Sequence, residues 1–336
     1  MPKSGILHIG LPKTATTSFQ NALYANRHRI LADYGIFYPS IEANHTNALC
    51  TMFLDDPRTH IALRVQGVTD LRAAEQIRSE FFEKLERDIE SVDWDTLVLS
   101  AEGLSNLPAP ALVRAREWLE KYTDDWTVLF WSRHPVTWSK SVIQQLLKNG
   151  KTFTEVIDKP QLPNFQGKLT NAFKAFGRES VHLTAFEDAV SEPGGVVAAF
   201  CRCLGLEEGV SMDIAKTAKH ENESMSMYGA YLLESMNRQR PYFVDGKISS
   251  SRRNGEVPFI LRIKGAKFDI PDAIKKNICV LARHDVKWLN DTFGTSYYMD
   301  VFDENNDESD GNETMANESL DTVALLVSDL INLIKR

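Results

Sequence analysis

Short apolar runs alternate along this chain with longer segments in which apolar residues recur at helical spacing. The apolar runs are 5–9, 96–100, 126–131 and 180–186, and the segments with helical spacing are 17–31, 70–92, 111–122, 169–176 and 271–293. A short apolar run between turn residues is typical of a buried strand, whereas spacings of three and four residues are typical of an amphipathic helix. Their alternation predicts an α/β fold, with a mainly parallel sheet and helices on both of its faces.

The end of the chain has a different composition. We expect the main domain to span 1–302, because acidic and polar residues dominate 303–319 and leave too little apolar surface for a core. That segment reads as a linker or an exposed loop. Over 320–336 one face of a predicted helix is apolar: Leu320, Val323, Leu326, Val327, Leu330, Ile331 and Ile334. We expect this helix to dock on its own domain, with a homodimer contact or a weak membrane contact as alternatives.

The overall composition, with 43% hydrophobic and 25% charged residues in 336, is that of a globular enzyme. The net charge of −8 argues against a nucleic-acid partner, because such proteins concentrate positive charge against the phosphates. No apolar stretch approaches the roughly 20 residues that cross a bilayer. The run 5–9 is too short for the core of a signal peptide. We therefore expect a cytoplasmic protein without a transmembrane segment.

A candidate phosphate loop, Gly10-Leu-Pro-Lys-Thr-Ala-Thr-Thr-Ser18, lies between the first predicted strand and the first predicted helix. Backbone N–H groups and the positive end of the helix favour a phosphate there, and Lys13 and the hydroxyl side chains add donors. The loop is not a Walker A sequence, which ends in G-K-[ST] after four intervening residues. Lys13 comes early, and Ala15 stands where a second glycine is expected.

This loop resembles that of the sulfotransferases that use 3′-phosphoadenosine 5′-phosphosulfate (PAPS), which commonly reads Pro-Lys-[Ser/Thr]-Gly-Thr-Thr after the first strand. The resemblance implies that Lys13 binds the bridging oxygen and helps the phosphate to leave. It also implies that the residues after Lys13 hold the 5′-phosphate, namely Thr14, Ala15, Thr16, Thr17 and Ser18. Ala15 is the departure from the family, which has glycine at this place.

A second motif supports the same resemblance. The family binds the 3′-phosphate with an arginine at the end of a later strand and a serine eight residues further on. Arg133 follows the predicted strand 126–131, and Ser141 stands eight residues after it. A guanidinium fork and a hydroxyl suit a terminal phosphate. The resemblance covers roughly 5–294 and implies a P-loop-like fold that transfers a sulfuryl group from PAPS to a hydroxyl or amine of a carbohydrate, lipid or small molecule.

Two residues are candidates for the base that takes the proton of the acceptor. Glu102 follows the predicted strand 96–100, and the carboxyl ends of parallel strands face the ligand crevice of an open α/β sheet. In the family, cytosolic members carry a histidine after a comparable strand, and several others use a glutamate. His45 is the rival, because some members supply the base from the region after the first helix. We favour Glu102 as the base and His45 as an acceptor-site residue.

Two other classes of function share parts of this pattern. A P-loop kinase or NTPase would have the same strand, loop and helix, but it needs a magnesium site that includes an acidic residue at a neighbouring strand end. The strand 126–131 is instead followed by Ser-Arg. A non-catalytic nucleotide-binding module would not require both Lys13 and a carboxylate at a strand end. No H-E-x-x-H or comparable cluster is present, so we expect no metal.

Overall fold

The computed structural model describes residues 2–218, 224–241, 243–244, 247–249 and 256–303. The chain divides into two compact units. The first, called the sheet unit below, comprises Met1–Arg133, Asn164–Glu221 and Asp291–Thr295; the second unit comprises His134–Pro163, Asn222–Asn290 and Ser296–Arg336. The predicted linker, from residue 304 onward, and the predicted final helix lie outside the described residues.

The sheet unit is built on five parallel strands in the order β2-β3-β1-β4-β5. Their bounds are β1 (Ser4–Gly10), β2 (Ile36–Phe37), β3 (Thr96–Ser100), β4 (Trp126–Ser132) and β5 (Val181–Ala185). In the register of the central strands, Ile6 lies between Val98 of β3 and Thr127 of β4. Strands with both faces covered by helices read as continuous apolar runs, as the central strands β3 and β4 do. The predicted α/β fold with a parallel sheet is confirmed.

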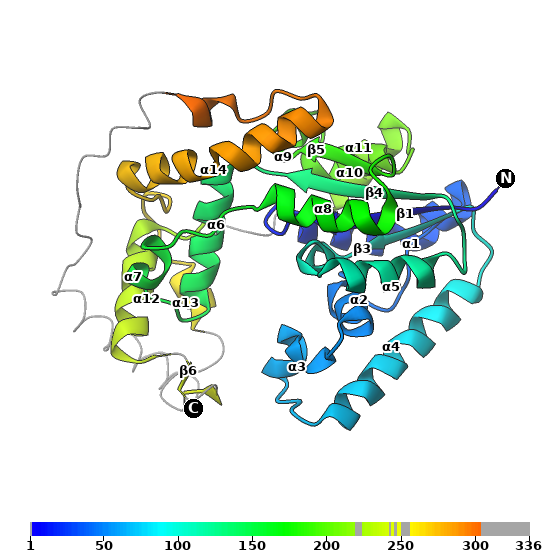
Figure 1. Ribbon diagram of the computed structural model, residues 1–336, viewed down its shortest axis with the longest axis horizontal. Coiled ribbons are helices and arrows are strands. Elements are labelled where there is room, and N and C mark those ends of the chain that lie inside the picture. The colour runs from blue at the N-terminus through cyan, green and yellow to red at the C-terminus, as the bar shows by residue number, and fades with distance from the viewer. Residues whose placement is uncertain (1, 219–223, 242, 245–246, 250–255, 304–336) are drawn as a thin grey trace. The chain divides into compact units, whose positions relative to one another are not determined.

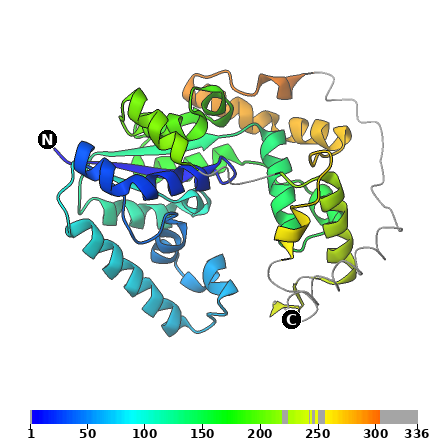
Figure 2. The ribbon, with the colours of Figure 1, turned by 180° about the vertical axis from the view of Figure 1, so that it is seen from behind.

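One face of the sheet is covered by α1 (Thr16–Tyr34), α9 (Phe186–Ser191), α10 (Gly195–Cys203) and α11 (Glu208–Thr217). Figure 2 shows α1, in blue, in front of the strands. The Phe19 ring of α1 stacks on Phe200 of α10 with the ring centroids 3.9 Å apart, and both rings contact Trp131 of β4. This aromatic cluster fixes α1, and therefore the loop that precedes it, against the sheet.

The opposite face carries α5 (Ala109–Leu119) and α8 (Phe165–Phe176), with α2 (Thr46–Phe53) and α4 (Leu71–Glu90) packed outside them (Figure 1). A 3₁₀ turn, η2 (Glu102–Asn106), leads from β3 to α5, and η1 (Pro57–Thr59) and α3 (Ile61–Val65) lie between α2 and α4. The first turn of α4 is capped by Asp70, whose Oδ1 accepts a 2.9 Å hydrogen bond from the Ala73 amide.

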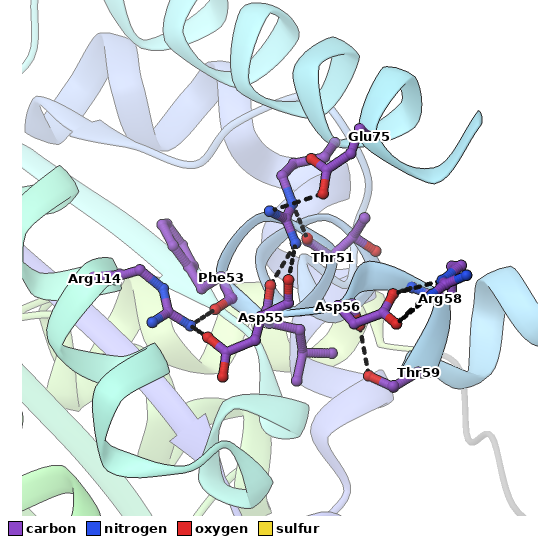
Figure 3. A network of polar contacts seen from close by, with 10 residues as sticks. Thr51, Phe53, Asp55, Asp56, Arg58, Thr59, Glu75 and Arg114 are labelled. Atoms are coloured by element: carbon purple, nitrogen blue, oxygen red, sulfur yellow. Dashed lines mark hydrogen bonds and ion pairs between the residues drawn. The ribbon is translucent and has the colours of Figure 1, made fainter. Parts of the chain in front are cut away.

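Two arginines hold the carboxyl end of α2 (Figure 3). Arg78 of α4 donates to the carbonyl oxygens of Thr51, at 3.2 Å, and of Leu54. Arg114 of α5 donates to the Phe53 carbonyl at 2.6 Å and to the Asp55 carboxylate. The last carbonyl groups of a helix have no partner within the helix, so these contacts satisfy them and fix this end of α2.

In its described residues, the second unit is helical apart from one short hairpin. Its elements are α6 (Pro135–Lys148), α7 (Phe153–Ile157), α12 (Met227–Gln239), β6 (Phe243–Val244), β7 (Lys247–Ile248), α13 (Val257–Ile260), most of α14 (Asp272–Phe293) and η3 (Met299–Phe302). Its core contains Leu147, Leu233 and Ile278, all fully buried. None of the helices in the described ranges combines the length and the apolar composition that crossing a bilayer requires. The cytoplasmic location and the homodimer contact stay predictions.

Candidate active site

The site follows from the topology of the sheet. β1 leads into α1 on one face, whereas its neighbour β3 leads through η2 into α5 on the other face. Loops that leave adjacent parallel strands toward opposite faces open a crevice at the carboxyl ends of those strands, and ligands of open α/β sheets bind there. The loop after β1 contains Lys13, and the turn after β3 begins at Glu102. The fold therefore brings together two candidates that are 89 positions apart in the sequence.

The backbone of the β1 loop has the left-handed conformations that a tight anion-binding loop needs. Gly10 has φ 130°, Lys13 has φ 71° and Ala15 has φ 56°. A Cβ atom on Gly10 would lie 2.9 Å from the Glu102 carbonyl oxygen and 2.8 Å from the Ser105 hydroxyl. Only glycine lets the loop pack this closely on η2. Ala15 adopts the conformation for which the family resemblance expected glycine.

Ala15 is also the N-cap residue of α1, directly before its first residue Thr16. A left-handed residue followed by a helical one turns successive N–H groups toward one point, which makes a concave site for an anion. The first N–H groups of a helix have no partner within the helix and carry its positive end. Thr14 is fully buried and donates to the Leu11 carbonyl at 2.6 Å, so its hydroxyl braces the loop. Thr17 is exposed and Ser18 is half-buried in the same first turn.

Glu102 contacts this loop directly. The Thr16 hydroxyl donates a short hydrogen bond to Oε2 of Glu102. Burial raises the pKa of the Glu102 carboxyl, while the Thr16 hydrogen bond and the positive charge of Lys13 act in the opposite direction. A carboxylate with a raised pKa, close to a lysine and a helix start, has the properties of a general base beside an anion site.

Arg133 joins the end of β4 to the same loop. Its guanidinium donates to the Lys13 carbonyl and lies over the Phe186 ring, 4.8 Å from the centroid. A guanidinium stacked on an aromatic ring is held in one orientation, with its remaining edge toward polar partners. Ser141, the predicted second ligand of the 3′-phosphate, lies on α6 in the second unit. Its role stays a prediction.

His45 directly precedes α2 and is fully buried. Its Nδ1 accepts a 3.1 Å hydrogen bond from the Ser100 amide, and its Nε2 lies 3.4 Å from the Pro39 carbonyl oxygen. Burial lowers the pKa of this imidazole to about 4, so the ring is neutral at pH 7. The structure thus places both ring nitrogens against the backbone, and the predicted contact of His45 with the acceptor stays a hypothesis.

Sequence reasoning missed the polar residues that surround the end of β3. Ser100 is bonded through its hydroxyl to Nδ1 of His8, at 3.0 Å, and to the Gln20 amide nitrogen, at 2.9 Å. Thr46 accepts from the Gly103 amide at 3.3 Å. The sequence offers one signal for these residues, which is that His8 and Ser100 are polar residues within otherwise apolar runs. Within the ranges that the structure describes, no group of three or more His, Cys, Asp or Glu residues is arranged to hold a metal ion.

The fold and the β1 loop together define a parallel α/β protein with a P-loop-like strand, loop and helix. Residues 5–193 match the model of the sulfotransferase domain family. This match spans more than half of the chain and includes Lys13, Glu102 and Arg133. The chain belongs to the sulfotransferase domain family, as the two motifs predicted. The family match ends at 193, short of the 294 to which the resemblance was traced.

Two solved structures are similar to the chain at low identity. A sulfotransferase from Alicyclobacillus acidocaldarius is 14% identical, with 89% of this chain and 99% of that one covered and a TM-score of 0.44. The sulfotransferase domain from the curacin biosynthetic pathway is 13% identical, with 66% of this chain and 93% of that one covered and a TM-score of 0.31. Comparison with curated protein sequences finds no match.

Proposed function

We propose that the protein transfers a sulfuryl group from PAPS to a hydroxyl or amine of an acceptor, which is a carbohydrate, a lipid or a small molecule. The observation that carries this proposal is the hydrogen bond between Thr16 and Glu102. It puts a carboxylate with a raised pKa directly beside the lysine-containing loop at the start of α1. A proton acceptor and an anion site are therefore adjacent, as in-line transfer to a nucleophile requires.

The residues of the β1 loop fit a phosphosulfate group. The N–H groups of the first turn of α1, including that of Thr16, and the hydroxyl of Thr17 are donors that suit phosphate oxygens. The Thr16 hydroxyl donates its one proton to Glu102. The Lys13 ammonium adds a charge to this donor set, and its influence extends to Glu102. When bound, PAPS supplies a sulfuryl group activated by its bond to phosphate. Arg133, fixed on Phe186 beside the loop, is the proposed ligand of the 3′-phosphate, together with Ser141.

Each side of the transfer has its own residue. As the acceptor oxygen or nitrogen bonds to sulfur, Glu102 takes its proton. As the bond from sulfur to the bridging oxygen breaks, the electron pair stays on the phosphate and Lys13 offsets the new negative charge. Because Glu102 accepts a hydrogen bond through Oε2 and titrates above its ordinary range, it can hold this proton without leaving the loop.

The test is transfer of ³⁵S from labelled PAPS to a panel of sugars, long-chain alcohols, phenols and amines. We expect labelling of at least one class, and Glu102→Gln should lower kcat by about 10²–10⁴ while the Kd of the product 3′-phosphoadenosine 5′-phosphate (PAP) is kept. Glu83→Gln, at an exposed position on α4, is the matched control and should retain full turnover. An acceptor that is already ionised at the assay pH, such as 4-nitrophenol, needs no base and should lose far less activity in Glu102→Gln.

Lys13→Ala tests the departing side of the reaction. It should lower kcat even at saturating PAPS, because the charge that develops on the leaving phosphate is no longer offset. Lys84→Ala, an exposed lysine on α4, is the matched control. Unlabelled acceptors throughout the panel, together with phosphoryl transfer from Mg-ATP, would move the protein to the kinase class.

A further inference from the structure

Ser100, the last residue of β3, stands two residues before Glu102 and is held by His45 on both sides of its backbone. The Ser100 amide donates to Nδ1 of His45 at 3.1 Å, and the Ser100 carbonyl accepts from the His45 amide at 3.0 Å. The two residues therefore form a closed pair of hydrogen bonds. His45 satisfies both backbone polar groups of Ser100, as a residue on a neighbouring strand would. The carbonyl bonds to the His45 amide, and the amide bonds to the His45 ring in place of a backbone carbonyl.

The geometry fixes the tautomer of His45. Because Nδ1 accepts a hydrogen bond, it carries no proton, and the ring proton must be on Nε2, which faces the Pro39 carbonyl at 3.4 Å. The ring also packs on Tyr38 with the centroids 4.7 Å apart, and no part of the residue is exposed. The lone pair of Nδ1 accepts the hydrogen bond from the Ser100 amide, so this nitrogen holds the backbone at the end of β3.

The next residue, Thr46, holds the other side of Glu102. Its hydroxyl accepts from the Gly103 amide at 3.3 Å. A Cβ atom on Gly103 would lie 2.4 Å from Cγ2 of Thr46, so the turn and the start of α2 are in direct contact. The far end of α2 is fixed by Arg78 and Arg114 (Figure 3). The backbone on both sides of Glu102 is thus held by two consecutive residues, His45, which precedes α2, and Thr46, the first residue of that anchored helix.

We infer that His45 is a positioning residue, which together with Thr46 orients the turn that carries Glu102. This inference rests on the proposed function of Glu102 as the base. A displacement of about 1 Å at a reacting group costs about 10²-fold in rate. Loss of the contacts that hold this turn can therefore lower kcat by about 10²-fold, although His45 does not itself touch the acceptor. The neutral ring is well suited to the task, because burial keeps the pKa of His45 near 4 and the Nδ1 lone pair available.

The test uses two replacements of similar size that place an acceptor oxygen differently. Asparagine puts Oδ1 near the position of Nδ1, whereas glutamine puts its oxygen near Nε2. We expect His45→Asn to keep kcat within a few-fold and His45→Gln to lower it by about 10²-fold, with the Kd of PAP unchanged in both. The assay is ³⁵S transfer from PAPS to the panel acceptor with the highest turnover. Equal losses in both variants, or none in either, would overturn the inference.

A pH profile separates positioning from proton transfer. If His45 only positions Glu102, the acid limb of kcat keeps its midpoint in His45→Gln, because the base is unchanged. Disappearance of that limb in His45→Gln, with its retention in Glu102→Gln, would make His45 the base and refute the inference. Full activity of Glu102→Gln, with His45→Asn and His45→Gln differing as expected, would refute Glu102 as the base. The role of His45 in holding the turn would still stand.

A readout without turnover comes from ¹⁵N NMR of the full chain. We expect His45 to appear as the neutral tautomer with the proton on Nε2, and the Gly103 amide to shift in His45→Gln but not in His45→Asn.

Thr46→Val and Thr46→Ser give an independent pair, in which only valine should lower kcat. His60→Gln is the matched control: this buried histidine lies 3.5 Å from the Thr51 hydroxyl, away from the turn, and kcat should be unchanged. A reversed pattern in these pairs would contradict the inference.

Discussion

The loop after β1 and the turn after β3 meet in the site, but their shapes have different origins. The β1 loop is shaped mainly by its own backbone, through the positive φ angles of Gly10, Lys13 and Ala15 and the internal bond from Thr14 to Leu11. The β3 turn is shaped by partners from elsewhere in the chain, which hold it through Ser100 and Gly103. The conformation of the β1 loop is set mainly by residues within it, whereas the β3 turn is held by His45 and Thr46.

This difference has a consequence for how each region responds to change. A locally shaped loop depends on which side chain each backbone angle tolerates, so its sensitive positions lie within the loop. A turn held from outside depends on distant residues, so its sensitive positions include His45 and, more weakly, the anchors of α2. The predictions below test this contrast through the free energy of unfolding, from the largest effect to the smallest.

Gly10→Ala should have the largest effect, because the new Cβ would lie 2.9 Å from the Glu102 carbonyl in a backbone conformation that alanine rarely adopts. We expect a loss of about 3 kcal/mol in the free energy of unfolding, measured by urea titration. Gly209→Ala, a position with no atom near the new methyl group, is the control and should be neutral or stabilising. If the two variants were equally stable, the loop would not be shaped by its glycine.

Arg78→Met tests the far anchor of α2. It removes charge-assisted bonds to the carbonyls of Thr51 and Leu54, and we expect a loss of about 2 kcal/mol. Because Arg114 still holds the neighbouring Phe53 carbonyl, kcat should change less than two-fold. A tenfold loss of kcat in this variant at full stability would extend the positioning role to the whole of α2.

Histidine burial predicts a pH dependence of stability. His45 is neutral in the folded protein, with its pKa lowered from 6.5 to about 4, and burial also lowers the pKa of His8, to about 3. The unfolded chain therefore binds more protons below pH 6.5, and stability falls as the pH drops from 6.5 toward 4. Each such histidine contributes about 1.4 kcal/mol per pH unit. His45→Asn should have a slope shallower by that amount, whereas the slope of Arg78→Met should equal that of the unchanged protein.

Ala15→Gly should have the smallest effect. Glycine relieves the cost of a left-handed alanine, about 1 kcal/mol, but it also frees the unfolded chain by a similar amount. We expect the free energy of unfolding to change by less than about 1 kcal/mol. A large loss in calorimetry would mean that the Ala15 methyl group itself packs in the loop.

The same contrast explains what the sequence could predict. The predicted strands match the observed β1, β3, β4 and β5 to within one residue at each end, because buried strands are continuous apolar runs between turns. The β1 loop could be recognised because its determinants are consecutive residues. Arg133 is a candidate from the sequence because it directly follows a predicted strand, and its role as a ligand of the donor stays a prediction.

The rest depends on contacts between distant parts of the chain. β2 is two residues long, too short to show a pattern. α2 follows His45, whose side chain does not cap the helix, and the one local signal is Asn44, whose Oδ1 accepts from the Thr46 amide at 2.9 Å. The bonds that hold Ser100 come from His8, Gln20 and His45, and no local pattern indicates such pairing. The sequence alone therefore predicts that His45 is an acceptor-site residue, whereas its position between Ser100 and Pro39 follows from the structure.

The central claim, that the β1 loop and Arg133 form a site for the donor, is tested most directly by calorimetric titration of the protein with PAP and, separately, with Mg-ATP. The account predicts that PAP binds without magnesium and more tightly than Mg-ATP, and that Arg133→Ala weakens it by about 1.5–3 kcal/mol through lost charge-assisted hydrogen bonds. Binding of Mg-ATP as tight as that of PAP, or an unchanged Kd for PAP in Arg133→Ala, would contradict it.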